Sequence, residues 1–573
     1  MKTKQQKQVE KKADWSRFLV LIYLIIISIL FIANYNRIFD EKIDMNGDNI
    51  VYYSLGKSLA DGKGYINTIG FEETPHGHFP PGYPAFISVL MKAGISSIHA
   101  IKVANGFLLY FSLMLLFFIF ADLSKNNLIA FTATAFLAYH SQLLRFATIM
   151  MSEILYIFVT ALIILIVLKW NVKTIFAERK KLWRDISLII LLSASLAYLY
   201  FVRTIGVSLM LAVLFYYGII FIQSLIKYFR IRWNDSGLPT KQAMTEMVKY
   251  AAICGVALIS LLAPKMAWDA RNIKCFGRAG SNYTSVFLQK EGGGQMETLA
   301  DWLERLKNNP TNYITNFIPT AIFNSLPDTE KPTLGDWLKG LIFTALMFFA
   351  LYKSGKKGLV LFLYLGFTFC VLFAYTEIYA GHRHMTPTMP FLVFLFLYGC
   401  FEFVKLLIDK YFKVKESKIY AISLSVLVCA IFSLVAQPIY AESMKGIELQ
   451  AKYKTYNQFN ATPSFVQFLQ AADWIKGNIP ATARIACRKP EIFHIFTDGR
   501  KCGNFPFYAT PEDILKGFEE NKIDYVIIDW WFRHAYHTVV PCIQKYSDKF
   551  VVVHQIGGAD NQPATYVVRF LHE

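Results

Sequence analysis

The chain has 573 residues, of which 54% are apolar, 16% aromatic and only 17% charged, against about 25% charged residues in soluble domains. A mean hydropathy of +0.35 excludes a single soluble domain, a disordered chain and a disulfide-stapled secreted module. Lys and Arg outnumber Asp and Glu by 59 to 41, giving a net charge of +18. In a membrane protein this excess belongs to cytoplasmic loops, so we expect no nucleic-acid partner.

A helix needs about 20 mostly apolar residues to cross a bilayer. Eleven segments are candidates for such helices, at 17–34, 101–121, 128–145, 153–169, 186–200, 204–226, 249–268, 337–352, 358–376, 388–405 and 418–437. The fifth is short, which suggests a broken or re-entrant segment. The first follows a basic stretch and no small-residue cleavage site follows it, so we interpret it as a retained helix and not a signal peptide.

Basic residues recur in alternate connections between the predicted spans, at 173–184, 227–232, 353–357 and 410–418. Because cytoplasmic loops are rich in Lys and Arg, this pattern predicts a cytoplasmic N-terminus. The loops 35–100 and 269–336 and the tail from 438 are then outside. At 68 residues by its numbering, the loop 269–336 is too long for a simple connector, so we expect it to carry helices.

The tail differs in pattern from the rest of the chain. Short β-type runs occur at 483–487, 523–529, 550–556 and 565–571. Helix-start signals lie between them, with a Thr before a Pro at 462–463 and at 510–511. This alternation predicts a small extracytoplasmic α/β domain at 438–573 after a transmembrane domain at 1–437. Cys487 and Cys502 flank a predicted turn in this domain, which leaves a disulfide open.

Ionisable residues at the membrane boundary gather on the predicted outer face, and such residues suggest function. They are Asp44, Asp48, Glu153, Arg203, Arg271, His382, Arg383 and His384. Arginines hold phosphate through paired hydrogen bonds, and a carboxylate acts as a general base or a metal ligand. Simpler interpretations remain open: solvated or helix-starting carboxylates and arginines at the lipid interface. The pairs His76/His78 and His382/His384 are weak indications of a metal site.

Several segments resemble a known family. They are GDNIVYYSLGKSLADGKGY (47–65), HFPPGYP (78–84), SEILYIF (152–158), FVRTIG (201–206), APKMAWDARN (263–272) and GHRHMTPTMP (381–390). In this order they resemble the GT-C class of membrane glycosyltransferases, related to protein O-mannosyltransferases and the lipid A aminoarabinose transferase. His78-Phe79-Pro80 stands where the aminoarabinose enzymes have Glu-Lys-Pro.

The resemblance implies that a sugar is transferred from a polyprenyl-phosphate carrier to an outer acceptor. It implies that Asp48 is the base or orients the acceptor, and that Glu153 is a second acid. Asp44 is a further catalytic candidate.

The resemblance also assigns Arg203, Arg271 and Arg383 to the donor phosphate. Further candidate contacts to substrate or metal are Tyr52, His76, His78, His382 and His384.

We therefore predict a polytopic α-helical, GT-C-like membrane protein with about 11 transmembrane helices and a small C-terminal α/β domain. The expected location is the bacterial cytoplasmic membrane. Expected partners are membrane lipids, a lipid-linked sugar donor and an envelope glycan, lipid or protein acceptor, and a divalent metal ion is a possible cofactor. The alternative is a transporter or flippase for a lipid-linked or anionic substrate, which favours charges at mid-membrane and inverted repeats.

Overall fold

The structure is a computed structural model of residues 1–573. It describes residues 4–572 except 46, 173–174, 176–180, 234–239, 278–286, 288–297, 326–330, 377–380, 413–416, 454, 457–462, 506–509, 532–533 and 559–562. The side chains of residues 4–16, 232, 240, 382, 418 and 534 also lie outside the described part. Parts of two predicted basic loops, at 173–180 and 413–416, and the predicted cap Thr462 fall in these gaps.

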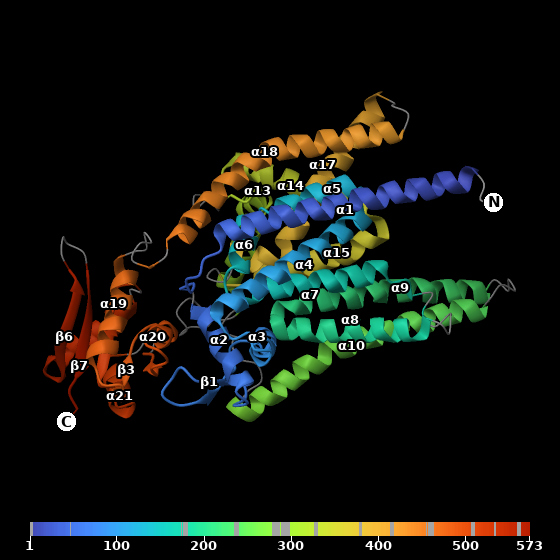
Figure 1. Ribbon diagram of the computed structural model, residues 1–573. Helices are drawn as coiled ribbons and strands as arrows, with labels where there is room; N and C mark the ends of the chain where they lie inside the picture. Colours follow the sequence, from blue (N-terminus) through green and yellow to red (C-terminus); the bar gives the residue numbers. More distant parts are fainter. Residues whose placement is uncertain are drawn as a thin grey trace.

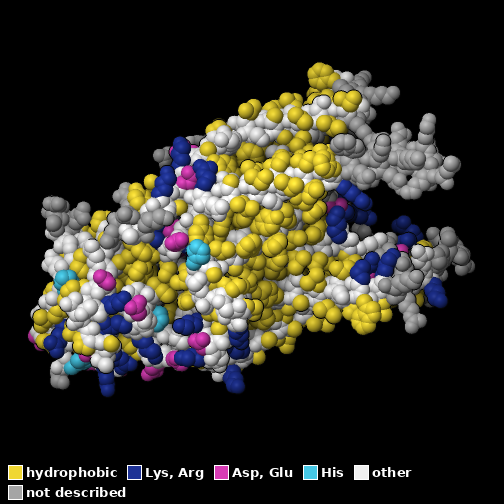
Figure 2. All heavy atoms as spheres, in the orientation of Figure 1, with side chains coloured by type: hydrophobic (Ala, Val, Ile, Leu, Met, Phe, Trp, Pro, Cys, Tyr) yellow, Lys and Arg dark blue, Asp and Glu magenta, His cyan; other side chains and the backbone are white. Residues whose placement is uncertain are grey.

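Long apolar helices run roughly parallel through most of the molecule (Figure 1). In the described ranges, ten are long and apolar enough to cross a membrane. They lie within α1 (Lys4–Ile38), α4 (Ile98–Ser124), α7 (Ser152–Lys169), α8 (Leu182–Val202), α9 (Val207–Trp233), α10 (Thr240–Phe276), α14 (Leu334–Lys353), α15 (Gly355–Ala374), α17 (Met389–Phe412) and α18 (Lys418–Lys452). Figure 2 shows a broad apolar belt over these helices, with charged side chains gathered toward its two ends. The chain is a multi-pass membrane protein.

Two of the eleven predicted spans differ from the structure. The third, at 128–145, is divided into α5 (Asn127–Leu137) and α6 (Ser141–Ala147). His140 at the break contacts the Ala321 carbonyl through Nε2 at 3.0 Å, and the Ser141 hydroxyl donates to Asn324 Oδ1 at 2.7 Å. These polar contacts hold the chain in a turn that the apolar sequence conceals. The fifth span was expected to be broken but is continuous as α8, with 21 residues.

Short elements gather beside the ends of the long helices. They are α2 (Gly47–Ala60), β1 (Ile66–Asn67), β2 (Thr74–Pro75), α3 (Gly82–Lys92), α12 (Leu299–Asn312), a π-helical turn (Tyr313–Phe317), α13 (Ile318–Phe323), α16 (His382–Met385) and 3₁₀ turns at Thr204–Gly206 and Thr386–Thr388. The predicted outer loop 269–336 therefore carries helices, as expected. The centre of the bundle is α7 and the first half of α17, where apolar side chains are buried on all sides.

The C-terminal part contains a five-stranded sheet in the order β4-β3-β5-β7-β6. Its elements are α19 (Pro463–Asn478), β3 (Ile485–Ala486), α20 (Pro490–Phe496), β4 (Cys502–Gly503), α21 (Pro511–Glu520), β5 (Tyr525–Ile528), α22 (His534–Lys545), a 3₁₀ turn (Ser547–Lys549), β6 (Phe550–Gly557) and β7 (Ala564–Phe570). β3, β4 and β5 are parallel, whereas β7 pairs antiparallel with β5 and β6. Thr510 caps α21 through a capping box with Asp513.

The C-terminal part packs directly on α2, the helix that carries Asp48. Ile50 of α2 is 1% exposed and lies in one apolar cluster with Phe468 and Ile492. A Cβ atom placed on Gly47 would lie within 2.0 Å of Glu491 Oε1, so the first turn of α2 and α20 are in close contact. The contact fixes α2 from the side opposite the membrane helices.

Candidate functional site

Four charged residues meet where several helices begin or end. Asp48 lies in the first turn of α2 and Glu153 in the first turn of α7, where the helix dipole favours a carboxylate. Arg203 follows α8 in extended backbone, just before a 3₁₀ turn, and Arg383 lies in α16. Segments far apart in the sequence thus supply one charged cluster at the end of the bundle that faces the C-terminal part (Figure 1).

Arg383 joins the two carboxylates of this cluster. Its Nη2 donates to Asp48 Oδ2 at 2.9 Å, and its Nε donates to Glu153 Oε1 at 3.1 Å. Arg203 Nη1 lies 2.8 Å from the same Glu153 oxygen and donates to the Ser152 hydroxyl at 3.1 Å. Two carboxylates and two guanidinium groups therefore balance one another in a compact, charge-neutral network.

The network is buried at one end and open at the other. The Glu153 side chain is fully buried and that of Arg203 is 15% exposed, whereas those of Asp48 and Arg383 are 33% and 35% exposed. Glu153 Oε2 is buried and has no hydrogen-bond partner among the described residues. Because an unpaired buried carboxylate oxygen is costly, this atom indicates a place for a ligand donor. Asp48 and Arg383 are the members that an incoming molecule reaches first.

Tyr52 closes the inner side of the cluster. Its hydroxyl lies 3.5 Å from Ser152 Oγ, and its ring packs against Tyr83 at 5.2 Å between centroids. Burial raises the pKa of Tyr52 to about 12, so the hydroxyl is protonated at neutral pH. Tyr83 in turn donates to Asn105 Oδ1 at 3.1 Å, and the amide of Asn105 donates to the Ile149 carbonyl at 2.5 Å. This chain of contacts holds α2, α3 and α4 together beneath Asp48.

Arg271 lies in a different environment from Arg203 and Arg383. Its Nη1 donates to the His76 carbonyl at 2.5 Å and its Nη2 to the Tyr65 carbonyl at 3.2 Å. The guanidinium also lies 5.2 Å from the centre of the Trp268 ring, a cation–π distance. In the structure Arg271 therefore holds the loop that follows α2.

The predicted histidines lie in two groups. His76 Nε2 accepts the Phe79 N–H at 3.0 Å, and burial lowers the pKa of His76 to about 3. His78 is exposed, with its ring 4.5 Å from that of Phe79. His384 packs its ring against Tyr375 at 5.8 Å. The side chain of His382 lies outside the described part of the chain.

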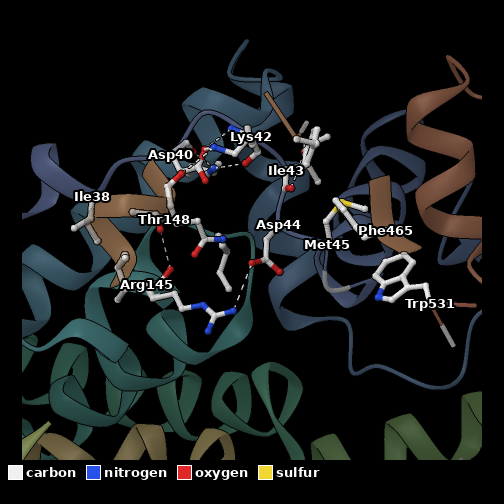
Figure 3. Close-up of a pocket in the computed structure, with 15 residues that line it drawn as sticks. Ile38, Asp40, Lys42, Ile43, Asp44, Met45, Arg145, Thr148, Phe465 and Trp531 are labelled. Atoms are coloured by element: carbon white, nitrogen blue, oxygen red, sulfur yellow. Dashed lines mark hydrogen bonds and ion pairs between the residues drawn. The ribbon is translucent and has the colours of Figure 1, made fainter. Parts of the chain in front are cut away.

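Asp44 lines a separate cavity of about 420 Å³. Figure 3 shows Asp44 and Arg145 pointing toward each other across this cavity, with Asp44 Oδ2 and Arg145 Nη2 3.8 Å apart. Phe465 and Trp531 line it from the C-terminal part. The sequence analysis missed these aromatic residues as site candidates, because nothing in the tail indicates which of its apolar side chains faces the membrane helices.

The described residues do not offer a complete ligand set for a resident metal ion. Within the described ranges, no three His, Cys, Asp or Glu side chains gather. The two carboxylates closest to one another in the cluster, Asp48 and Glu153, already share the cation Arg383. Among the described residues, the expected divalent metal therefore has no matching donor set.

The comparisons with known proteins concern the fold. No protein-family model and no curated protein sequence matches the chain. The oligosaccharyltransferase AglB of Archaeoglobus fulgidus, in complex with an inhibitory peptide and a dolichol-phosphate, aligns with 90% of this chain and 69% of its own, with a TM-score of 0.53 and 11% identity. The same protein tethered to an acceptor peptide aligns with 96% of this chain and 74% of its own, with a TM-score of 0.54 and 11% identity.

A second solved protein, ArnT from Cupriavidus metallidurans bound to undecaprenyl phosphate, aligns with 96% of this chain and 98% of its own, with a TM-score of 0.48 and 11% identity. At such low identities the AglB alignments show the fold alone. The chain is a polytopic helical membrane protein with the GT-C fold. The predicted fold class is thereby confirmed.

Proposed function

We propose that the chain is a glycosyltransferase that moves a sugar from a polyprenyl-phosphate carrier to a cell-envelope acceptor. The observation that carries this proposal is the network of Asp48, Arg383, Glu153 and Arg203 at the ends of apolar helices. It combines a partly open carboxylate with two guanidinium groups, which suits removal of a proton beside a departing phosphate. The GT-C fold that the chain shares with the oligosaccharyltransferase AglB supports the same function.

In the proposed reaction, Asp48 accepts the proton of an acceptor hydroxyl or amine. The acceptor atom forms a bond to the anomeric carbon of the sugar as the bond from that carbon to the phosphate oxygen breaks. The electron pair of the broken bond stays on the polyprenyl phosphate. Arg383 and Arg203 stabilise the charge that develops there, while Glu153 holds both guanidinium groups in place.

An apolar cavity near the network gives the prenyl chain a place to bind. It measures about 400 Å³, and α14, α15 and α17 contribute Met347, Phe369 and Leu392 to its wall. Phe373 at the end of α15 also lines it, and Tyr375 two residues later contacts His384, the neighbour of Arg383. A chain in this cavity would place its phosphate toward Arg383.

The proposed orientation puts the reaction on the outer side of the bacterial cytoplasmic membrane. The predicted cytoplasmic loops are basic, and the opposite end of the bundle carries the network and the C-terminal part. The C-terminal part is proposed as an extracytoplasmic domain at 438–573, although α18 continues through residue 437 to Lys452. In this orientation the site faces envelope acceptors.

Transfer of radiolabelled sugar from polyprenyl-phosphate sugars by the purified protein tests the proposal. We expect Asp48→Asn to lower kcat by at least about 100-fold, because general base catalysis contributes on the order of 10²–10⁴. Asp61→Asn is the matched control, since Asp61 is exposed just after α2 and should leave transfer unchanged.

Two outcomes of this assay would contradict the proposal. If Asp48→Asn turned over at the wild-type rate, Asp48 could not be the general base. Movement of the lipid-linked sugar across vesicle membranes without any transfer product would instead favour a flippase.

A further inference from the structure

Two cavities lie on either side of the loop that joins α1 to α2. The first is the cavity of Figure 3, which holds Asp44 and Arg145. The second measures about 590 Å³ and is lined by the outer ends of α1 and α4 and by the end of α18. Asp40 and Lys42 line both cavities. At these two residues the two cavities are therefore divided by this loop.

The loop between the cavities is held firmly. Lys102 of α4, which is 2% exposed, donates from its ammonium group to the Lys42 carbonyl at 2.8 Å and also to the Asp40 carbonyl. Lys42 donates to Asp40 Oδ1 at 2.8 Å and to the Gln450 carbonyl of α18 at 3.1 Å. A buried cation that binds carbonyl groups rigidifies the backbone, so the loop forms a fixed ridge at Asp40–Lys42.

The second cavity opens toward the lipid. Ile32 of α1 and Phe107 of α4 both line it, and they are 55% and 59% exposed on helices long enough to span a membrane. Phe31, Tyr35 and Phe39 add an aromatic wall. Because exposed apolar side chains on a spanning helix contact acyl chains, this cavity can admit a hydrocarbon chain sideways from the bilayer.

The first cavity has the chemistry of a headgroup site. Arg145 lines this cavity, is 55% exposed, and lies 3.8 Å from Asp44 in its described ion pair. Its guanidinium group carries five N–H donors, so it can bind a polar headgroup there. Phe465 and Trp531 meet edge to face at 4.9 Å and present apolar ring surface. A few polar groups beside aromatic rings characterise sites for polar organic ligands, and the C–H face of a sugar packs on such rings.

We infer that the two cavities together bind one amphiphile, a glycolipid that serves as the sugar acceptor. Its hydrocarbon chains lie in the second cavity, its sugar lies in the first, and the ridge at Asp40–Lys42 supports the junction between them. This inference rests on the proposed function and narrows its acceptor to a lipid. A water-soluble acceptor has no use for a cavity that opens into the bilayer.

The position of the first cavity suits an acceptor. Asp44 precedes Asp48 by four residues, and Ile149, which also lines the cavity, precedes Glu153 by four. The same two segments therefore lead from the cavity into the charged network. The apolar cavity proposed for the donor chain is formed by other helices, α14, α15 and α17, so donor and acceptor lipids approach from different helices.

The experiment uses the full chain in lipid nanodiscs that contain a monohexosyl diacylglycerol with a diazirine in one acyl chain. After irradiation, mass spectrometry maps the labelled residues. We expect labelling to concentrate on residues 31–38 of α1, on Phe39 directly after it, and on residues 99–107 of α4. Val103→Trp and Ile32→Trp, which fill or cover the second cavity, should lower this labelling at least fivefold. Phe111→Trp is the matched control, because Phe111 is 50% exposed on α4 and lines neither cavity.

Two results would overturn the inference. One is labelling spread evenly over all lipid-facing helices and unchanged in both Trp variants; the other is displacement of the probe by a soluble peptide but not by unlabelled glycolipid. Failure of the proposed function has a different signature. In that case the wild-type chain transfers no sugar to the glycolipid, yet the site-specific labelling persists.

Discussion

Arg383 and Glu153 are central both to the packing of the charged network and to the chemistry proposed for it. Glu153 binds both arginines through one oxygen and leaves the other without a described partner. Its sequence position, at the start of an apolar helix, indicated a functional or a helix-starting residue, and in the structure it lies in the first turn of α7 and pairs with both arginines. The pairing of Glu153 with Arg383 could not be predicted, because the two residues are 230 positions apart and a single sequence does not show which distant residues are in contact.

Glu153→Gln separates the structural part of this network from its chemical part. Breaking a buried ion pair leaves unpaired charge, which costs about 3–5 kcal/mol, so we expect a clear fall in the thermal unfolding midpoint in detergent. The double variant Glu153→Gln/Arg203→Met should recover part of that loss while transfer remains low.

The matched control for that measurement is Glu73→Gln. The ion pair of Glu73 with Lys63 is exposed on both sides, and exposed pairs contribute little, so its unfolding midpoint should not change. Full activity in the double variant would contradict the chemical role of Glu153 and Arg203.

His76 is expected to make stability depend on pH. Its folded pKa of about 3 lies below the ordinary value of 6.5, so the unfolded chain binds the extra proton and stability is lost as pH falls from 6.5 toward 3. Between pH 7 and pH 5 this amounts to about 2 kcal/mol. The fall in unfolding midpoint between these pH values should be smaller in His76→Asn than in the wild type. His572→Asn, at an exposed ring, should keep the wild-type fall; an unchanged fall in His76→Asn would contradict the assignment.

At the scale of elements, the segment HFPPGYP begins α3 and brings its first residue, Gly82, against the backbone at the end of α8, just before Arg203. A Cβ on Gly82 would lie 2.5 Å from the carbonyl of Phe201, and the Gly82 carbonyl accepts the Tyr198 hydroxyl at 2.8 Å. Gly82→Ala should therefore displace the end of α8 and lower the unfolding free energy by about 1–3 kcal/mol, with reduced transfer.

Gly218→Ala provides the comparison for Gly82→Ala. Nothing lies within 4 Å of a Cβ at Gly218 inside α9, and Ala favours a helix over Gly by up to about 1 kcal/mol. Its unfolding midpoint should stay level or rise. If both variants lost the same stability, the close contact of Gly82 with the end of α8 would not explain the effect of Gly82→Ala.

Hydropathy predicted the long helices well because a spanning segment must be apolar whatever it packs against. It failed at 128–145, where the contacts of His140 and Ser141 with distant residues turn the chain. In the C-terminal part, the four β-type runs correspond to β3, β5, β6 and β7. The Cys-Gly pair of β4 lies outside these runs, because Lys501 and Asn504 flank it and no apolar run continues on either side. The thiols of Cys487 and Cys502 are adjacent, with Sγ atoms 3.3 Å apart and no bond between them.

At the scale of the whole molecule, the proposed orientation can be measured with a membrane-impermeant maleimide on sealed cells. In a chain whose exposed Cys275 and Cys370 are replaced by Ser, Lys63→Cys should react because it lies in the proposed outer loop. Arg230→Cys, in a predicted cytoplasmic loop, should react only after the membrane is permeabilised. If Arg230→Cys reacted in sealed cells and Lys63→Cys only after permeabilisation, the orientation would be opposite to the one proposed, with the charged network on the cytoplasmic side.

The order in which the three ion pairs of the network can form also bears on how the protein is made. Glu153 lies at the start of α7 and Arg203 directly follows α8, the next spanning helix, so they can neutralise each other as soon as both have left the ribosome. Asp48 must wait for Arg383, 335 residues later, but it stays outside the apolar helices meanwhile. The network is then completed only after α16, which carries Arg383, has been synthesised.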